Sequence, residues 1–541
     1  MIGRHESAEG SFQPISAFLG IPYAQPPVGP LRFARPILLD SEWNGVLDAS
    51  EYGPFCPQNP KVMNDGAYEP TCLPEKSSLS EDCLQLNIFT PDPSKKLPVL
   101  VFIHGGGYIY GSGILYDGTA LAAMQDIVVV SFNYRLAPFG YLHDDQGSEL
   151  PATGHLGHLD QRIALQWVQK YIQYFGGDPS RVTLAGQSAG AASVTFHLLS
   201  EESRGLFSQA VIHSDYTLKS SHPKSGKSAI QRLMHQLEGC EQKEIFECLR
   251  EKSPEEIIEV FEVDFAGNDR NIARWTPVFD GVNLALDPTQ ELLMLNFTQV
   301  PVLIGVTANE GWGLSTYLLP EAMQDNTTLT YSGHFLSATR KFLSDVYGAD
   351  EPYFEEILSA VLDFNFGKSP KMLEDEGFLL RRWSDLVGDL YLRSPTTRLA
   401  QLLTASSQLT FFYEFSHRPS HIRSERPLWH HGCDHTSELQ FFWGFPYLNS
   451  HSRCNTLYTA EEMSFTKDVM AYYANFIKSG NPNSEDLFLW PEFSRSREDY
   501  IIMQPSFMKA SGYKQDRVNF YMGKLLHMRN KCKGHETHDE L

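Results

Sequence analysis

Apolar runs alternate with helical stretches through much of the chain. Short runs rich in Val, Ile, Leu and Phe predict buried strands, at residues 97–103, 126–132, 182–185, 209–213, 300–306 and 408–415. Between residues 163 and 175 the apolar side chains fall on one face of a helix. The glycines and proline at 176–179 end that helix, and a second helix is expected from residue 189 onward.

This alternation predicts the fold class. Apolar strands separated by helices are typical of an α/β protein whose mostly parallel central sheet is covered by helices on both faces. Residues 220–299 and 321–405 are helix-rich and more charged, and we expect them to be large helical excursions that pack over the sheet. The chain is therefore expected to form one domain over residues 1–534, followed by a short flexible tail at 535–541.

Composition and charge narrow the class of protein. Of the 541 residues, 42% are hydrophobic and 20% are charged, which is globular composition with a large core. The chain has 44 Lys and Arg against 66 Asp and Glu, and its net charge of −22 repels phosphate backbones, so nucleic acid is not an expected partner. No run of 18 apolar residues occurs, so no transmembrane segment is expected.

The pentapeptide at 186–190, Gly-Gln-Ser-Ala-Gly, carries the candidate chemistry. It fits the pattern G-x-S-x-G and lies between the strand predicted at 182–185 and the helix that follows. Strand, sharp turn and helix are the context of a nucleophile elbow, in which the turn lifts a serine hydroxyl clear of the sheet edge. A serine that only caps the helix is the alternative. The strand before it favours a nucleophile at Ser188.

A serine nucleophile needs hydrogen-bond donors for the oxyanion, and a glycine-rich segment offers them. His104-Gly-Gly-Gly107 follows the strand predicted at 97–103 and matches the HGGG element, whose backbone N–H groups stabilise a tetrahedral oxyanion. The N–H of Ala189, directly after Ser188, should supply another donor. A flexible turn is the alternative interpretation of the three glycines.

The nucleophile also needs a base and an acid that orients the base. Glu310 follows the strand predicted at 300–306, and the carboxyl ends of strands are where α/β sheets place their sites. His435 lies in a loop beyond the strand predicted at 408–415. With 19 histidines in the chain, spacing alone does not choose the base, and His430 and His431 remain alternatives at this point.

Several ordered motifs together resemble one family, the type-B carboxylesterases of the esterase/lipase family, which includes cholinesterases and liver carboxylesterases. The likeness runs from about residue 17 to about residue 519. Its motifs are Phe-Leu-Gly-Ile-Pro-Tyr-Ala at 18–24, Pro-Val-Gly-Pro-Leu-Arg-Phe at 27–33, Ser-Glu-Asp-Cys-Leu-Gln-Leu-Asn-Ile at 80–88, Asn-Tyr-Arg at 133–135, Phe-Gly-Gly-Asp-Pro at 175–179, and Phe476 with Gly-Asn-Pro at 480–482.

The resemblance implies an α/β-hydrolase fold and assigns roles to the candidates. It makes Ser188 the nucleophile, Glu310 the triad acid and His435 the base in an H-x-x-E-L segment. The three donors of the oxyanion hole that it implies are Gly106, Gly107 and Ala189. The expected reaction is hydrolysis of a small carboxylic ester through an acyl-enzyme, without metal or cofactor. A lipase or hormone-type esterase of the same family, or a non-catalytic adhesion relative, is the alternative.

The resemblance also implies two disulfides among the eight cysteines, Cys56–Cys83 and Cys240–Cys248. An even number of cysteines fits an oxidising compartment. The other four have no counterpart in the family, although a Cys433–Cys454 bridge stays open; they are Cys72, Cys433, Cys454 and Cys532.

The chain departs from the family pattern near the candidate site. Gln187 stands where cholinesterases carry Glu, and no Trp occurs between Cys56 and Cys83, so acetylcholine is not an expected main substrate. Ser214-Asp215 replaces the usual Ser-Gly. His155 and His158 stand where other residues are usual, and we expect them to be surface or packing variants.

The two ends of the chain bear on its compartment. His538-Asp-Glu-Leu541 is an HDEL retrieval signal, which a receptor of the endoplasmic reticulum reads. The first twelve residues hold no apolar segment, so we expect that the native start lies upstream of this sequence. The expected location is the lumen of the endoplasmic reticulum, with secretion as the alternative. Two glycosylation sequons, at Asn296 and Asn326, agree with either.

Overall fold

The structure is a computed structural model, and this description covers most of the chain. The residues that it describes are 1–6, 8, 14–40, 45–59, 78–143, 154–218, 235–240, 244–266, 277–278, 284, 287–323, 329–349, 351–420, 432–448 and 458–532.

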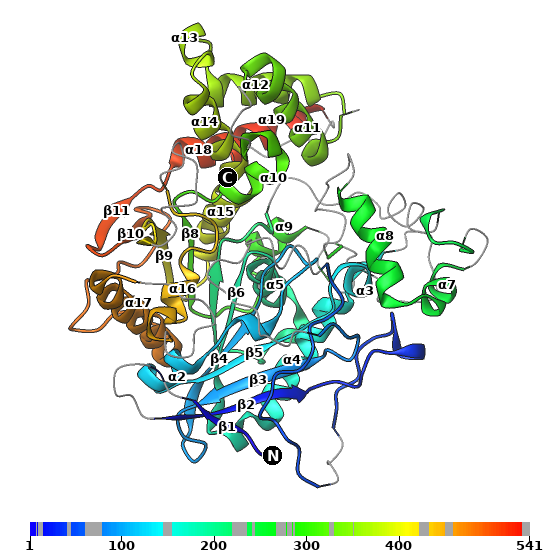
Figure 1. Ribbon diagram of the computed structural model, residues 1–541. Helices are drawn as coiled ribbons and strands as arrows, with labels where there is room; N and C mark the ends of the chain where they lie inside the picture. Colours follow the sequence, from blue (N-terminus) through cyan, green and yellow to red (C-terminus); the bar gives the residue numbers. More distant parts are fainter. Residues whose placement is uncertain are drawn as a thin grey trace.

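The described strands form one sheet of eleven, in the order β1-β2-β3-β5-β4-β6-β7-β8-β9-β10-β11 (Figure 1). Their bounds are β1 Arg4–Glu6, β2 Ile15–Pro22, β3 Gln85–Thr90, β4 Leu97–Ile103, β5 Val128–Phe132, β6 Gly177–Gln187, β7 Gln209–His213, β8 Val302–Thr307, β9 Thr410–Phe415, β10 Asp499–Met503 and β11 Met508–Ser511. All six pairings from β5 to β10 are parallel, while β1, β2, β3 and β11 pair antiparallel at the flanks. The mostly parallel sheet expected from the sequence is therefore confirmed.

Helices cover both faces of this sheet, because side chains of a strand point alternately to either side. From β4, Val99 and Val101 enter one core, and Leu100 and Phe102 enter the other. Every residue of β4 is buried, as expected for a strand covered on both faces. The first core is packed by α4 Leu156–Tyr171, α5 Ala189–Leu199 and α15 Ser394–Leu403. The second is packed by α2 Thr119–Gln125, α16 Leu439–Phe442 and α17 Ala460–Ser479.

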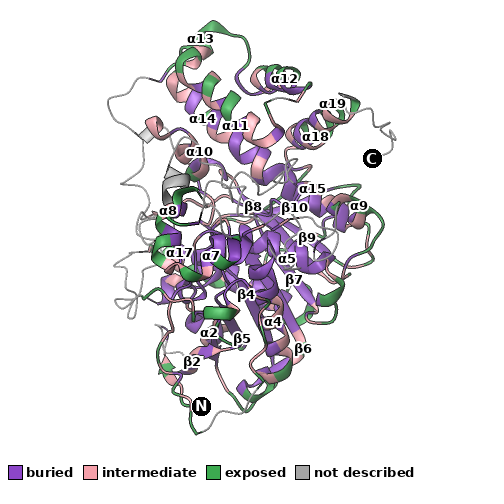
Figure 2. Cartoon of the chain, turned by 90° about the vertical axis from the view of Figure 1, so that its right-hand side faces the viewer, coloured by how far each residue is buried: buried purple, intermediate pink, exposed green. Residues whose placement is uncertain are grey.

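A third apolar core lies outside the sheet, in the helical excursion expected between residues 321 and 405. It is built by α11 Leu336–Tyr347, α12 Phe354–Phe366 and α14 Glu376–Gly388, together with the chain end at α19 Leu525–Cys532. Figure 1 shows these helices as a group at the end of the molecule opposite the N-terminus. Figure 2 shows that the sheet below them is buried, whereas the outer surfaces of α12 and of α13 Pro370–Leu373 are exposed.

The remaining described α-helices connect or flank these layers. They are α3 Ala137–Tyr141, α7 Ile245–Glu251, α8 Pro254–Ala266, α9 Pro288–Leu293, α10 Trp312–Leu318, α13 Pro370–Leu373 and α18 Gln515–Asn519. Among the described residues, no helix combines the length and the apolarity needed to cross a lipid bilayer.

Among the described residues, the disulfides Cys56–Cys83 and Cys240–Cys248 are closed, as the family resemblance implied. Cys433 is a free, buried thiol whose Sγ donates to the backbone oxygen of Phe415 at 2.7 Å. The Cys433–Cys454 bridge that the sequence left open is therefore wrong for this structure. Cys454 and Cys72 lie outside the described residues, and so does the side chain of Cys532.

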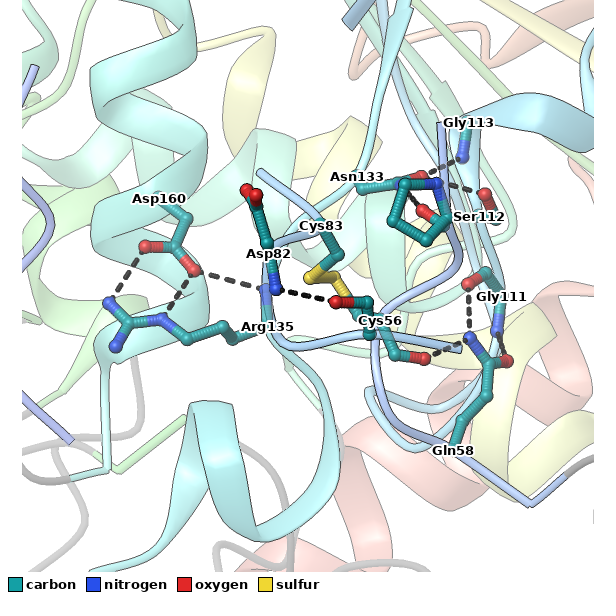
Figure 3. The surroundings of a disulfide bond; sticks show 12 residues. Cys56, Gln58, Asp82, Cys83, Gly111, Ser112, Gly113, Asn133, Arg135 and Asp160 are labelled. Carbon is teal, nitrogen blue, oxygen red and sulfur yellow. Dashed lines mark hydrogen bonds and ion pairs between the residues drawn. A yellow bond between two sulfur atoms is a disulfide. The ribbon is translucent and has the colours of Figure 1, made fainter. Parts of the chain in front are cut away.

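A buried ion pair joins the segment after β5 to α4 (Figure 3). Arg135 Nη2 lies 2.8 Å from Asp160 Oδ1, and Arg135 Nε donates to Asp160 Oδ2 at 2.9 Å. The side chains are 3% and 0% exposed. Burial raises the pKa of Asp160, and the guanidinium of Arg135 opposes that rise. The pair thus keeps a charged carboxylate inside the core.

Arg135→Ala is expected to lower the free energy of unfolding by about 3–5 kcal/mol, because it leaves the Asp160 carboxylate buried without its partner. Chemical denaturation followed by circular dichroism measures this change. The matched control is Lys95→Ala, which removes an ion pair to Asp126 whose side chains are 50% and 56% exposed. We expect no measurable loss there. Equal losses in both variants would contradict the argument from burial.

Candidate active site

Ser188 lies in the sharp turn between β6 and α5, as the pentapeptide predicted. Its backbone has φ 57° and ψ −118°, a strained conformation for a residue other than glycine. The turn is held because Ser188 N donates to the backbone oxygen of His213 at 2.9 Å. Strain that the surrounding structure maintains is typical of a functional position. Ser188 is the N-cap residue of α5, and its side chain makes no cap hydrogen bond.

The elbow packs so closely against β4 that glycine is required at its second flank. A Cβ atom added to Gly190 would lie 2.0 Å from the backbone oxygen of Ile103. One added to Gly105 would lie 2.8 Å from the backbone oxygen of Gln187 and 3.2 Å from Ser188 Cβ. The glycine-rich segment after β4 is therefore in direct contact with the candidate nucleophile.

Polar side chains hold the continuation of this segment at residues 111–113 (Figure 3). Gln58 accepts from Gly111 N at 2.7 Å and donates to the oxygens of Gly111 and Cys56, each at 3.0 Å. Asn133 Oδ1 accepts from Ser112 Oγ at 2.7 Å and from Gly113 N at 2.9 Å. These contacts connect residues 111–113, which follow the three glycines, with the neighbourhood of Cys56 and with Asn133 at the end of β5.

Three backbone amides in this region could bind an oxyanion. Within the described residues, no protein acceptor takes a hydrogen bond from the N–H of Gly106, Gly107 or Ala189. Gly106 and Gly107 have φ of 108° and 61°, and Ala189 begins α5. Preorganised amides without an acceptor are the donors that a developing negative charge requires.

Glu310 lies three residues beyond the end of β8 and is fully buried. Its Oε1 accepts from Ser214 Oγ at 2.5 Å and from Thr307 N at 2.7 Å, while its Oε2 faces His435. Burial raises the pKa of Glu310, but the contacts with His435, Ser214 and Thr307 outweigh it, so the pKa lies below its usual value. The carboxylate is therefore charged at neutral pH.

His435 meets Glu310 across the carboxyl edge of the sheet. The distance between His435 Nδ1 and Glu310 Oε2 is 2.6 Å, and the histidine side chain is 23% exposed. A carboxylate at Nδ1 fixes the tautomer that leaves Nε2 free to accept a proton. His430 and His431, the alternatives, lie outside the described residues.

The turn that carries Glu310 is joined to the loop that carries His435 through their backbones. Asn309 N donates to the oxygen of Cys433 at 3.1 Å, and Asn309 and Asp434 form an isolated parallel bridge. On its other side, Ala308 O accepts from Arg393 Nη1 at 2.6 Å. Sequence reasoning did not find Arg393, because neither its spacing nor a motif connects it with the site.

Ser214 and Asp215, the departure from Ser-Gly, have separate roles in packing. Ser214 contacts Glu310 as described, whereas Asp215 is buried and accepts from Thr195 Oγ1 at 2.8 Å and Thr217 N at 2.6 Å. Burial raises the pKa of Asp215 to about 6, and these donors oppose the rise.

His155 and His158 are packing residues, and the surface alternative is wrong. They are 0% and 2% exposed, and the His158 ring stacks on His197 with centroids 4.2 Å apart.

Comparison with known proteins agrees with this geometry. A family model described as "Carboxylesterase family" matches residues 1–521. Cocaine esterase of Oryctolagus cuniculus is 35% identical over 545 aligned positions, covering 98% of this chain and 96% of that protein. Liver carboxylesterase of Sus scrofa is 35% identical over 540 positions, covering 96% and 91%. Pyrethroid hydrolase Ces2e of Rattus norvegicus is 34% identical over 536 positions, covering 97% and 89%.

Proposed function

Because this chain belongs to the carboxylesterase family and is a serine hydrolase of carboxylic esters, we propose that Ser188, Glu310 and His435 form its catalytic triad. The observation that carries the assignment is the 2.6 Å contact between His435 Nδ1 and Glu310 Oε2, at the same sheet edge as the strained turn of Ser188.

In the proposed reaction, His435 Nε2 takes the proton of Ser188 as Oγ attacks the ester carbonyl. Glu310 keeps the imidazole in its tautomer and balances the positive charge that the ring gains. His435 then gives the proton to the departing alcohol, which leaves an acyl group on Ser188. Water, activated by the same base, attacks the acyl group and releases the carboxylic acid.

The amides of Gly106, Gly107 and Ala189 are proposed to bind the oxyanion of both tetrahedral intermediates. The contact of the neighbouring Gly105 with the elbow, and the lack of acceptors for the three amides within the described part of the chain, support this role. Each donor of this kind typically contributes about 3 kcal/mol to transition-state stabilisation.

The substrates are proposed to be small-molecule carboxylic esters. Two relatives are named for small-molecule substrates, cocaine and pyrethroids, which supports this class of substrate. Rates with p-nitrophenyl esters of graded acyl length measure this preference. A rate that rises steadily to long acyl chains would instead favour the lipase alternative.

Labelling tests the nucleophile directly. A fluorophosphonate should attach to Ser188 in a 1:1 ratio and abolish activity, since only an activated serine attacks phosphorus at a useful rate. Peptide mass mapping identifies the labelled residue. Loss of activity with the label at another serine would refute the assignment.

We propose further that the HDEL tail is a retrieval address and that Asn296 carries a glycan. Asn296 is exposed just after α9, whereas Asn326 and residues 533–541 lie outside the described residues. With an added signal peptide, the intact chain should stay inside cells and the chain lacking residues 538–541 should reach the medium, with equal esterase activity. Equal secretion of both chains would contradict retrieval.

The glycan at Asn296 has its own test. Treatment with a peptide N-glycosidase should lower the mass of the Asn296 peptide in the wild-type chain, and the same peptide of Asn296→Gln should not change in mass.

A further inference from the structure

Gln187 contacts the base at the nitrogen that the proposed reaction uses. It is the last residue of β6, and it is 1% exposed. Gln187 Nε2 lies 3.0 Å from His435 Nε2 and 3.5 Å from His435 Nδ1. His435 Nδ1 also lies 2.6 Å from Glu310 Oε2. The imidazole thus contacts a carboxylate at Nδ1 and an uncharged amide beside Nε2.

An amide satisfies both protonation states of the ring. Gln187 Nε2 is close to both ring nitrogens, so the amide packs against the face of the imidazole beside Nε2. When Nδ1 holds its proton toward Glu310, the neutral ring has a lone pair on Nε2, and a small turn of the ring or amide brings an N–H of Gln187 to it. After the ring gains a proton, Nε2 is a donor, and the amide oxygen accepts from it once the amide turns over. A carboxylate in this place could only accept, so it would favour the protonated ring, which is not a base.

The contact lies beside the nitrogen that must take the proton of the nucleophile. In the part of the chain that the structure describes, Ser188 Oγ makes no hydrogen bond with His435, and Gln187 is the partner of Nε2. His435 Nε2 must come within hydrogen-bond reach of Ser188 Oγ when it takes the proton. Catalytic hydrogen bonds often tighten only when substrate is bound, so the arrangement fits a resting enzyme.

Three other titratable groups lie on the elements around His435, and two of them are uncharged at neutral pH. Glu438, on the segment of His435 itself, is 1% exposed, and burial together with the charge of Glu310 raises its pKa to about 8, so it is protonated at neutral pH. His213 of β7 lies 3.7 Å from Glu438, and burial lowers the pKa of His213 to about 3, so it is neutral. Asp434 precedes His435 and is 6% exposed. All of them are unchanged in the variants compared below.

We propose that Gln187 is a positioning residue for the base. Its amide holds the Nε2 edge of His435, and because it carries no charge, it lets the imidazole serve as a base at lower pH than a carboxylate would allow. The inference rests on the proposed role of His435.

The test compares Gln187→Glu and Gln187→Met in the full chain. The measurement is the pH profile of kcat/KM between pH 5 and 9 with a p-nitrophenyl ester, which has no titrating group. Gln187→Glu should raise the pH of half-maximal kcat/KM by about 1–2 units, because a negative charge next to the ring stabilises its protonated form. Gln187→Met keeps the volume and removes the hydrogen bond, so kcat should fall about tenfold with KM and the pH midpoint unchanged.

Each outcome decides the inference. An unmoved midpoint in a folded Gln187→Glu, or a wild-type kcat in Gln187→Met, would overturn it. If Gln187→Glu does not fold, Gln187→Met alone tests the positioning role. A drop in kcat with KM and the pH midpoint unchanged supports that role, and a wild-type kcat refutes it. Fluorophosphonate labelling of the wild type distinguishes a failure of this inference from a failure of the proposed function. Label at Ser188 with no effect of the Gln187 variants refutes this inference alone, whereas label elsewhere refutes the proposed function.

Discussion

Replacing Ser188 with alanine is expected to lower kcat for ester hydrolysis by about 10⁶-fold, because no acyl-enzyme can form. The remaining rate should still exceed that in water, since the oxyanion donors and the binding site stay in place. Steady-state assays with a p-nitrophenyl ester, and a fluorophosphonate label that no longer attaches, measure the effect.

The fold should survive this change. Alanine tolerates the backbone of Ser188 no worse than serine does, and the turn is held by a backbone hydrogen bond to His213. Ser180→Ala is the matched control, because Ser180 lies at the far end of the same strand and its hydroxyl contacts Asp178. It should keep wild-type kcat. A Ser188→Ala enzyme with more than a percent of wild-type activity would require another nucleophile.

His435→Ala is expected to lower kcat by at least about 10³-fold, and Glu310→Gln somewhat less. The first variant removes the base. The second keeps the shape of the acid but loses the charge that fixes the tautomer of His435 and balances its protonated form. Burst kinetics with a p-nitrophenyl ester measure acylation and deacylation separately, and both steps should slow, since the same base serves both.

The control for this pair is His334→Ala, which changes a half-buried histidine of the helical excursion and should leave kcat unchanged. If His430→Ala or His431→Ala produced the large loss in place of His435→Ala, the position assigned to the base would be wrong.

The strands nearest the site could be predicted from the sequence because they are buried on both faces. The runs predicted at 97–103 and 209–213 agree with β4 and β7, and the others differ by a few residues at their ends. The five flanking strands β1, β2, β3, β10 and β11 were not predicted. β1 has three residues and β11 is short and largely exposed, so neither has the apolar pattern that identifies a strand. β2, β3 and β10 are buried or half-buried, and their apolar residues were not recognised as strands.

Within the site, residues placed by local turns could be predicted from the sequence, whereas residues placed by contacts between distant segments could not. Ser188 and the glycines are fixed by local turns, and Glu310 follows its strand directly, so motif and position were enough. His435 could not be chosen among 19 histidines by spacing, since its place depends on a backbone contact between Asn309 and Cys433. The contacts of Gln187 and Arg393 depend on side chains that meet only in the folded chain.

The bridge between Asn309 and the loop of His435 has a consequence for local opening. The proposed acid and base, Glu310 and His435, are 125 residues apart in the sequence, and the hydrogen bond from Asn309 N to the oxygen of Cys433 helps to join the segments that carry them. The amide of Asn309 can therefore exchange its hydrogen with solvent only when the two segments separate. Hydrogen–deuterium exchange at this amide then reports how often the resting enzyme loses its acid–base pair. A denaturant concentration that speeds this exchange should inactivate the enzyme before the sheet unfolds.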